Sequence, residues 1–210
     1  MFTVICVMKS GGIYDASWVR KLRDAVARNV SIPYKFVCLS DVDVPCERIP
    51  LKHDWPGWWA KIELFRPRVI TEPTLYLDLD TAITGSLDGI AELQSDFATI
   101  RSFADPHMIG SGLMWFRKVP HQIYEKFVKQ PDAYIAHHER NQSGAYIGDQ
   151  GFINDVLGRK ADVLTDLFAG ITSYKLHHKS KLLPGTSIVC FPGTPKPTEV
   201  KDEWLLEAWQ

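Results

Sequence analysis

The sequence lacks a long apolar run and has almost no net charge. It contains no stretch of about 18 apolar residues, and its N-terminus does not show a charged segment followed by an apolar one, so we expect neither an integral membrane segment nor a signal peptide. The formal net charge is −1, which gives no general attraction for nucleic acid or for an anionic membrane. We therefore expect no nucleic-acid partner.

The four cysteines are scattered, and no two of them form a C-x-x-C pair. Three lie in or beside apolar, strand-like runs, where a free cysteine behaves as a small hydrophobic residue. A reduced, cytoplasmic protein is the plain interpretation. Internal repeats, low-complexity tracts and linkers are also missing, and 210 residues are enough for one domain with its own core. The sequence predicts a single domain over residues 1–210.

The first forty residues predict a β-α-β unit. Residues 2–8 form an apolar run typical of a strand, and Asp15 or Ser17 is a favourable cap for a helix that ends before Pro33. Residues 34–39 supply a second strand. Because a helix joins the two strands, we expect them to pair in parallel through a right-handed crossover.

The rest of the chain continues this mixture of strands and helices. We expect further strands at residues 75–77, 97–100, 112–116 and 187–191, and helices at residues 58–65, 121–128, 149–157 and 204–209, with one short helix near residue 90. Residues 40–57 are expected to be a long polar connection. The pattern predicts an α/β fold with a mostly parallel, Rossmann-like central sheet flanked by helices.

Residues 75–81, Leu-Tyr-Leu-Asp-Leu-Asp-Thr, lead from a buried strand into two carboxylates. In an extended chain, residues i and i+2 project to the same side, so Asp78 and Asp80 are predicted to point at one spot. Open α/β sheets bind ligands just past the end of such a strand. Two hard oxygen donors there suit Mg²⁺ or Mn²⁺ bound to a substrate phosphate. A solvated acidic turn is the alternative.

Four other segments accompany this D-x-D pattern. They are Trp-Trp-Ala-Lys-Ile-Glu-Leu-Phe at residues 58–65, Ser111-Gly112, Gly148-Asp149-Gln150, and Phe-Pro-Gly-Thr-Pro-Lys-Pro at residues 191–197. The set resembles the GT-A glycosyltransferases related to glycogenin and the bacterial lipopolysaccharide galactosyltransferases, above all their small bacterial and phage-type members. The resemblance covers about residues 1–200. It implies a GT-A fold and a metal-dependent, retaining hexosyltransferase that uses a UDP-sugar donor and a glycan, lipid-linked or protein acceptor.

The resemblance gives the two acids and two lysines roles at the donor. Asp80 is the first metal ligand, and Asp78 is either a second ligand or a partner of the donor ribose. Lys196 and Gly193 match a G-x-x-K-P element whose lysine meets the donor phosphates, where an ammonium suits growing negative charge. Lys61 matches a basic position near the donor sugar. The alternatives are a solvated loop lysine for Lys196 and a helix-surface lysine for Lys61.

Asp149 and Gln150 resemble a D-Q pair that faces the reacting sugar carbon. Asp149 would bind sugar or acceptor hydroxyls, and Gln150 would steady the positive centre through its amide oxygen. A simple helix cap is the alternative for Asp149. Ser111 resembles the serine of an N-S-G element, but Gly110 stands in the place of the asparagine that touches the donor sugar. The sequence therefore does not predict which sugar is transferred.

The nucleotide base and the acceptor have weaker candidates. Tyr14 is placed to stack on a pyrimidine ring, and Asp41, at the end of the second strand, to hydrogen-bond it. Both residues also fit ordinary turn roles. Trp58 and Trp59 offer aromatic faces to an acceptor sugar, and core packing of at least one of them is equally expected.

The chain departs from the family pattern at one metal ligand. Relatives usually supply a histidine just before the terminal glycine of the lysine-containing element, most often three residues before it. Here that position is Cys190, and Pro192 directly precedes the glycine. A thiolate is soft whereas Mg²⁺ and Mn²⁺ are hard. Three alternatives remain open. Water replaces the missing metal ligand, the side chain of His177 or His178 moves to the metal, or metal binding is weak.

This departure leaves a second function open, a non-catalytic relative that binds a nucleotide-sugar or a glycan. A nucleotidyltransferase is a third option, but Lys-Ser-Gly-Gly at residues 9–12 is too sparse for the phosphate loop of such enzymes. The oligomeric state is not predicted.

Overall fold

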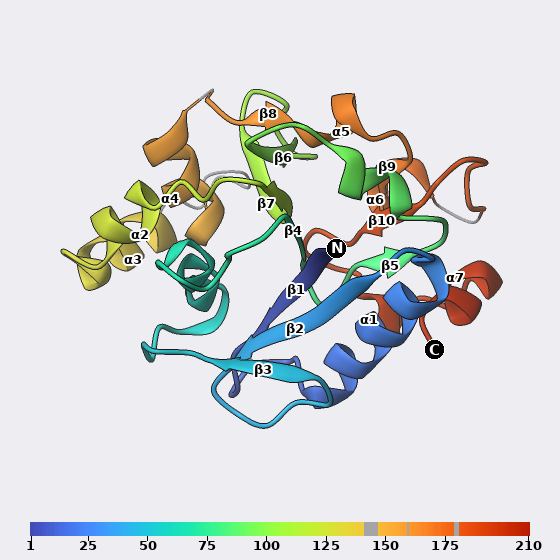
Figure 1. Cartoon of the computed structure of the whole chain (residues 1–210), viewed down its shortest axis with the longest axis horizontal. Coiled ribbons are helices and arrows are strands. Elements are labelled where there is room, and N and C mark those ends of the chain that lie inside the picture. Colours follow the sequence, from blue (N-terminus) through green and yellow to red (C-terminus); the bar gives the residue numbers. More distant parts are fainter. Residues whose placement is uncertain (141–146, 159, 179–180) are drawn as a thin grey trace.

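A seven-stranded sheet, with strand order β3-β2-β1-β4-β7-β6-β8, forms the centre of the computed structural model (Figure 1). The structure describes residues 1–140, 147–158, 160–178 and 181–210. The strands of this sheet are β1 (Phe2–Met8), β2 (Tyr34–Ser40), β3 (Glu47–Pro50), β4 (Thr74–Leu77), β6 (Phe97–Arg101), β7 (Ile109–Phe116) and β8 (Asp162–Val163). A smaller sheet of order β5-β10-β9 contains β5 (Ala82–Ile83), β9 (Ile171–Ser173) and β10 (Ile188–Cys190).

The central sheet is mostly parallel, and its one reversed strand determines where the candidate site lies. Strands β3, β2, β1 and β4 pair in parallel, while β7 runs antiparallel to both of its neighbours, β4 and β6. The carboxyl ends of β1, β2 and β4 therefore meet at one edge. Because β7 is reversed, it begins at that same edge, with Leu113 opposite Leu77.

Helices cover both faces of this sheet (Figure 1). One group consists of the 3₁₀ helix η1 (Gly57–Phe65) with α2 (Gln122–Phe127), α3 (Pro131–Arg140) and α4 (Gly148–Leu157). The other side carries α1 (Ala16–Asn29), α7 (Glu203–Ala208) and the smaller sheet. Among the described residues, the short helices are also η2 (Asp88–Glu92), α5 (Leu164–Leu167), α6 (Tyr174–His177) and η4 (Pro197–Glu199).

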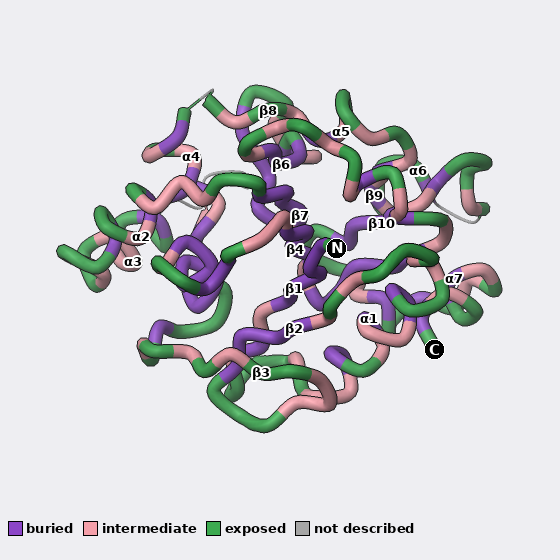
Figure 2. Tube along the Cα trace, viewed as in Figure 1, coloured by how far each residue is buried: buried purple, intermediate pink, exposed green. Residues whose placement is uncertain are grey.

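The core has two halves, one on each face of the sheet. Side chains alternate along β1, so Phe2, Val4 and Cys6 pack in one half and Ile5 packs in the other. Figure 2 shows buried chain running through β1, β4 and β7 in the middle of the molecule. Since both faces are covered, these strands are continuous apolar runs rather than alternating ones.

The β-α-β unit at the N-terminus is confirmed, with β1 and β2 parallel. Asp15 caps α1, its carboxylate accepting a hydrogen bond of 2.8 Å from the Ser17 main-chain N–H. All four cysteines are free thiols. Among the described residues, no helix is long and apolar enough to cross a membrane.

Several details differ from the prediction. Residues 58–65 form a 3₁₀ helix rather than an α-helix, and the connection over residues 40–57 contains the edge strand β3. The elements that the sequence did not predict are β3, β5, β8, β9, α3, α5, α6 and η4. Most of these are four residues or fewer, so their hydrogen bonds rather than their own periodicity define them.

Candidate functional site

The two acids of the D-x-D pattern lie in a turn directly after β4, not in extended chain as predicted. The main-chain N–H of Asp78 donates to the Gly112 carbonyl at 3.0 Å, which ends the pairing with β7, and Thr81 N–H then donates to the Asp78 carbonyl at 3.1 Å. A Cβ at Gly112 would lie 3.0 Å from Asp78 Oδ2. Despite the turn, Asp80 is close enough for the Asp78 charge to raise its pKa.

A buried ammonium joins Asp78 to the helix α4. Lys61 Nζ lies 3.0 Å from Asp78 Oδ1 and 3.2 Å from Asp149 Oδ2, and it donates to Ser111 Oγ at 3.3 Å. The Tyr76 hydroxyl also donates to Asp78. We call Lys61, Asp78 and Asp149 the inner cluster. Its residues come from η1, from the turn after β4 and from α4, and Ser111 of β7 lies beside them.

Two members of the inner cluster are almost closed to solvent, since Lys61 is 6% exposed and Asp149 5% exposed, whereas the Asp78 side chain is 34% exposed. Burial alone would lower the pKa of Lys61, but the negative charges of Asp149 and Asp78 outweigh it and raise the pKa above its usual value. Burial raises the pKa of Asp149, while Lys61 and Ser111 oppose that shift. Lys61 is therefore a charged, buried residue, and the alternative of a helix-surface lysine is wrong.

A second group of charges surrounds Asp80. The Tyr14 hydroxyl donates to Asp80 Oδ2 at 2.8 Å, and the Lys196 ammonium contacts the same oxygen. Lys196 Nζ also lies 5.7 Å from the centre of the Tyr14 ring. We call Tyr14, Asp80 and Lys196 the outer cluster. Its members come from three connections, after β1, after β4 and after β10.

Asp80 remains short of positive charge in this arrangement. Burial raises its pKa most, and the charge of Asp78 raises it further. Lys196 and Tyr14 lower the pKa but do not cancel the two opposing effects. The carboxylate would therefore be stabilised by a further cation.

Cys190 ends β10 beside the acid pair. Its thiol is buried, and burial followed by the charges of Asp78 and Asp80 holds its pKa well above the usual value. Without a bound metal, the thiol is thus protonated at neutral pH. Pro192, the other position at which relatives place a histidine, is exposed.

The two histidines that sequence reasoning offered as substitutes are held elsewhere by hydrogen bonds. His178 Nε2 lies 2.7 Å from Thr172 Oγ1, and its Nδ1 lies 3.3 Å from the Leu183 main-chain N–H. His177 Nδ1 accepts a bond of 2.9 Å from the Ser173 N–H. Burial lowers the pKa of His178. Both rings stabilise the region around α6, and the structure does not bring them to the acid pair.

The start of helix α4 carries the predicted D-Q pair. Asp149 lies in the first turn, and no side chain caps this helix; its carboxylate faces Lys61 instead, so the helix-cap alternative is wrong. Gln150 Oε1 accepts a hydrogen bond of 3.3 Å from the Ser111 main-chain N–H. The structure thus brings Lys61, Asp78, Ser111, Asp149 and Gln150 together.

Asp41 lies at the same edge of the sheet but in its own set of contacts. Its carboxylate accepts from Lys9 Nζ at 2.6 Å and from the Ser10 N–H and hydroxyl at 2.9 and 2.6 Å. Burial would raise the pKa of Asp41, but these bonds lower it to about 2. Asp41 therefore anchors the loop after β1 to the end of β2. Its contact with a base stays a prediction.

The two neighbouring tryptophans have different environments. Trp59 is 1% exposed and belongs to the core, whereas Trp58 is 52% exposed. A Cβ at Gly148 would lie 2.4 Å from Trp58 Nε1, so the indole lies directly against the residue that precedes Asp149. Of these two tryptophans, Trp58 remains a candidate for contact with an acceptor sugar.

The structure adds two residues that sequence reasoning missed. Lys175, on α6, has its ammonium 3.2 Å from where a Cβ of Gly193 would lie, so a second lysine approaches the Lys196 loop. Gly193 itself has φ +71°, a left-handed conformation that favours glycine. The second residue is Tyr76, whose hydroxyl donates to Asp78 from within β4. A tyrosine between two leucines of a buried strand was the sequence feature that could have identified it.

No protein-family model and no curated protein matches this chain. Solved structures do match. The glycosyltransferase GlyE of Streptococcus pneumoniae TIGR4 is 18% identical with a TM-score of 0.66, covering 94% of this chain and 56% of GlyE. This chain therefore spans little more than half the length of GlyE.

Two other solved structures are similar over most of this chain. The galactosyltransferase LgtC, in complex with donor and acceptor sugar analogues, is 10% identical with a TM-score of 0.65, covering 98% of this chain and 94% of LgtC. The bifunctional glycosyltransferase WbbM is 10% identical with a TM-score of 0.61, covering 93% of this chain and 46% of WbbM. These similarities confirm the predicted fold: the chain has the GT-A glycosyltransferase fold.

Proposed function

We propose that residues 1–210 form a single-domain, metal-dependent, retaining glycosyltransferase that moves a hexose from a UDP-sugar to a carbohydrate-type acceptor. The fold shared with GlyE and LgtC supports glycosyl transfer. The observation that carries the proposal is the buried carboxylate of Asp80, short of positive charge at the edge of the sheet. Open α/β sheets bind their ligands at such an edge.

The residues present fit a divalent cation. Asp78 and Asp80 would hold Mn²⁺ or Mg²⁺ through hard carboxylate oxygens, and the burial of Asp80 together with its raised pKa supports a cation there. Two carboxylates are sufficient for these ions when phosphate oxygens and water complete the coordination. When bound, the ion would neutralise charge on the departing diphosphate as a Lewis acid.

The two lysines have separate roles in this proposal. When the donor binds, the Lys196 ammonium leaves Asp80 and contacts the donor diphosphate. It then stabilises the negative charge that grows on the diphosphate as the bond to the sugar breaks. Gly193 lets the main chain of this loop come close to the phosphates. Lys61 holds both carboxylates in position, because each lies within 3.2 Å of its ammonium, and it opposes the rise that burial causes in the pKa of Asp149.

The start of α4 faces the sugar in this proposal. Asp149 binds sugar or acceptor hydroxyls, while Gln150 and Ser111 lie beside the anomeric carbon. The acceptor oxygen attacks from the face that the diphosphate leaves, and its proton passes to a departing phosphate oxygen, which gives retention without an enzyme nucleophile. Tyr14 and Asp41 lie toward the base, and the exposed indole of Trp58 supports the acceptor.

The cysteines bear on the cellular compartment of the proposed enzyme. Four free thiols support a reduced compartment such as the cytoplasm.

The identity of the donor sugar is left open, because a Cβ at Gly110 would lie 3.0 Å from Ile100 Cγ1 and 3.2 Å from the Arg101 carbonyl. The asparagine that touches the sugar in relatives has no room here unless β6 moves.

The test is a panel of nucleotide-sugars, with Mn²⁺ or with a chelator, monitored for UDP release and by NMR for the anomeric configuration of the product. We expect UDP release from a UDP-hexose only with the metal, and a product with the donor's configuration. Equal release in the chelator would contradict the metal requirement, and an inverted product would contradict retention.

A second candidate function is a non-catalytic binder of nucleotide-sugars or glycans. It is favoured by the protonated Cys190 at the histidine position of relatives and by the crowding at Gly110. Thermal stabilisation by UDP together with no UDP release from any donor would support this candidate over the enzyme.

A further inference from the structure

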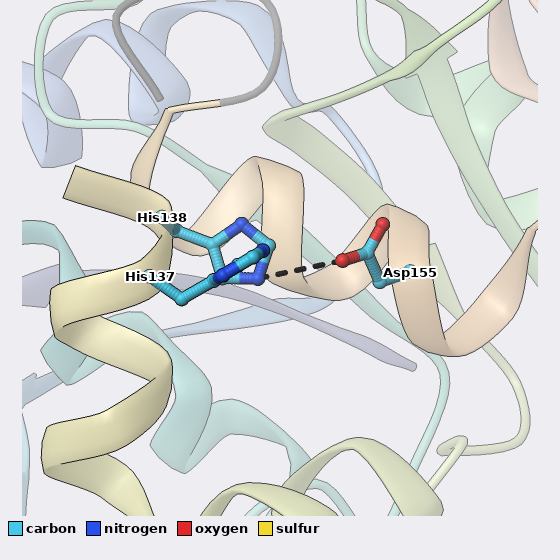
Figure 3. A group of neighbouring side chains, drawn as sticks. All are labelled: His137, His138 and Asp155. Carbon is cyan, nitrogen blue, oxygen red and sulfur yellow. Dashed lines mark ion pairs between the residues drawn. The ribbon is translucent and has the colours of Figure 1, made fainter. Parts of the chain in front are cut away.

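Two histidines and an aspartate come together at a place that the proposed function does not use. His137 and His138 project from α3 toward Asp155 on α4 (Figure 3). One ligand atom from each side chain lies within 4.8 Å of the other two. His138 Nε2 is 3.5 Å from Asp155 Oδ2.

These distances are close to those of a zinc site. With bonds of about 2.0–2.1 Å in tetrahedral geometry, two ligand atoms are about 3.4 Å apart. The 3.5 Å between His138 and Asp155 already matches that separation and is too long for a strong hydrogen bond. His137 is exposed, so its ring can turn to close the remaining gap, which is at most about 1.4 Å between the 4.8 Å limit and that separation.

The surroundings hold one ligand fixed and leave one position open. His138 is 1% exposed, and its ring centre lies 6.2 Å from that of Trp59 and 6.0 Å from that of Phe152. A cavity of about 300 Å³ is lined by all three ligand residues and also by Phe152 and Lys126. It has room for a water or an exchangeable fourth ligand, and Lys126 would favour a negatively charged one.

We propose that His137, His138 and Asp155 bind a divalent transition metal, with Zn²⁺ the best fit. Two imidazoles and a carboxylate form a mixed nitrogen and oxygen set that Zn²⁺ binds readily, whereas Mg²⁺ and Mn²⁺ prefer oxygen. The metal would join α3 to α4, the helix that carries Asp149 and Gln150 at its other end. This site is separate from the donor-site cation and does not depend on the proposed function.

The experiment is a titration of the full chain with Co²⁺, whose tetrahedral complexes absorb visible light, followed by displacement with Zn²⁺. We expect visible bands that Zn²⁺ abolishes. His137→Ala and Asp155→Asn should each weaken Co²⁺ binding by more than the roughly 10–100-fold that losing an outer hydrogen-bond partner costs. Both positions are exposed, so these variants should keep the circular dichroism of the parent.

Two control variants make the result specific. His107→Gln changes an exposed histidine away from the cluster, and Asp80→Asn changes the donor site, so both should retain the parent's bands and affinity. Parent protein that gives no bands would overturn the proposal and leave an ordinary ion pair between His138 and Asp155. Unchanged affinity in both His137→Ala and Asp155→Asn would overturn it as well.

Discussion

The inner and outer clusters both pair a lysine ammonium with aspartate but are built differently. Lys61 lies in η1 and is held by two carboxylates and a hydroxyl, and its side chain is 8% exposed. Lys196 lies on a loop, contacts one carboxylate, and its side chain is 18% exposed. The inner cluster is therefore a fixed part of the fold, whereas the outer cluster can exchange its partners for a ligand. Each prediction below tests this difference.

Lys61→Met should have the largest effect on stability. The change leaves the buried carboxylate of Asp149 and the partly exposed one of Asp78 without their shared cation, which costs about 3–5 kcal/mol. Urea unfolding followed by circular dichroism measures the loss. Lys196→Met is the matched comparison and should cost less, since its ammonium contacts one carboxylate instead of two and its side chain is 18% exposed. Equal losses for the two variants would remove the distinction between the clusters.

Asp80→Asn should separate activity from stability. We expect metal-stimulated UDP release to fall on the order of 10²–10³-fold, the scale of losing one preorganised electrostatic group.

The same substitution should change stability in a pH-dependent way. The pKa of Asp80 is raised in the folded protein, so its charge opposes folding above the unfolded pKa of about 3.9. The variant should therefore unfold at higher urea than the parent at pH 7, and this gain should disappear below about pH 4. A variant less stable than the parent at pH 7 would contradict this account.

Lys196→Ala should weaken UDP binding by about 1–3 kcal/mol, the value of a charge-assisted contact. Isothermal titration calorimetry with Mn²⁺ present measures it. Lys201→Ala, an exposed lysine further along the chain, serves as the control. If both variants bind UDP as the parent does, Lys196 does not contact the donor.

Asp41→Asn should have the smallest effect and a different pH dependence. The pKa of Asp41 is lowered to about 2 in the folded protein, so its contribution is present above the unfolded pKa and is lost as the pH falls from about 4 to 2. We expect a loss of about 1 kcal/mol at pH 7, because solvent screens part of the interaction. Urea unfolding at pH 7 and pH 3 should show the difference shrinking. A constant difference would contradict the assignment.

The sequence predicted the central strands well, for a physical reason. β1, β4 and β7 are buried on both faces, and such strands are visible as continuous apolar runs. β5 and β8 contain two residues each, and only their pairing partners define them. The spacing of Asp78, Asp80 and Lys196 in motifs likewise identified them without a structure.

The inner cluster was only partly predictable. Lys61 was singled out, but its burial between Asp78 and Asp149 depends on η1, β4 and α4 meeting in space, which no local pattern encodes. The turn at Asp78 was missed because apolar residues on both sides read as continuous strand. Lys175 was missed because α6 is a four-residue helix without periodicity of its own.

The missing side chain at Gly112 has a consequence for how this protein can change over generations. A methyl group there would meet the Asp78 carboxylate at 3.0 Å, so the two positions are not free to mutate independently. Lineages that keep aspartate at 78 should be restricted to glycine at 112, and alanine should arise at 112 only after the acid has been lost or β7 has shifted. Homologous sequences that carry both alanine at position 112 and aspartate at position 78 would show that the backbone shifts more easily than this geometry implies.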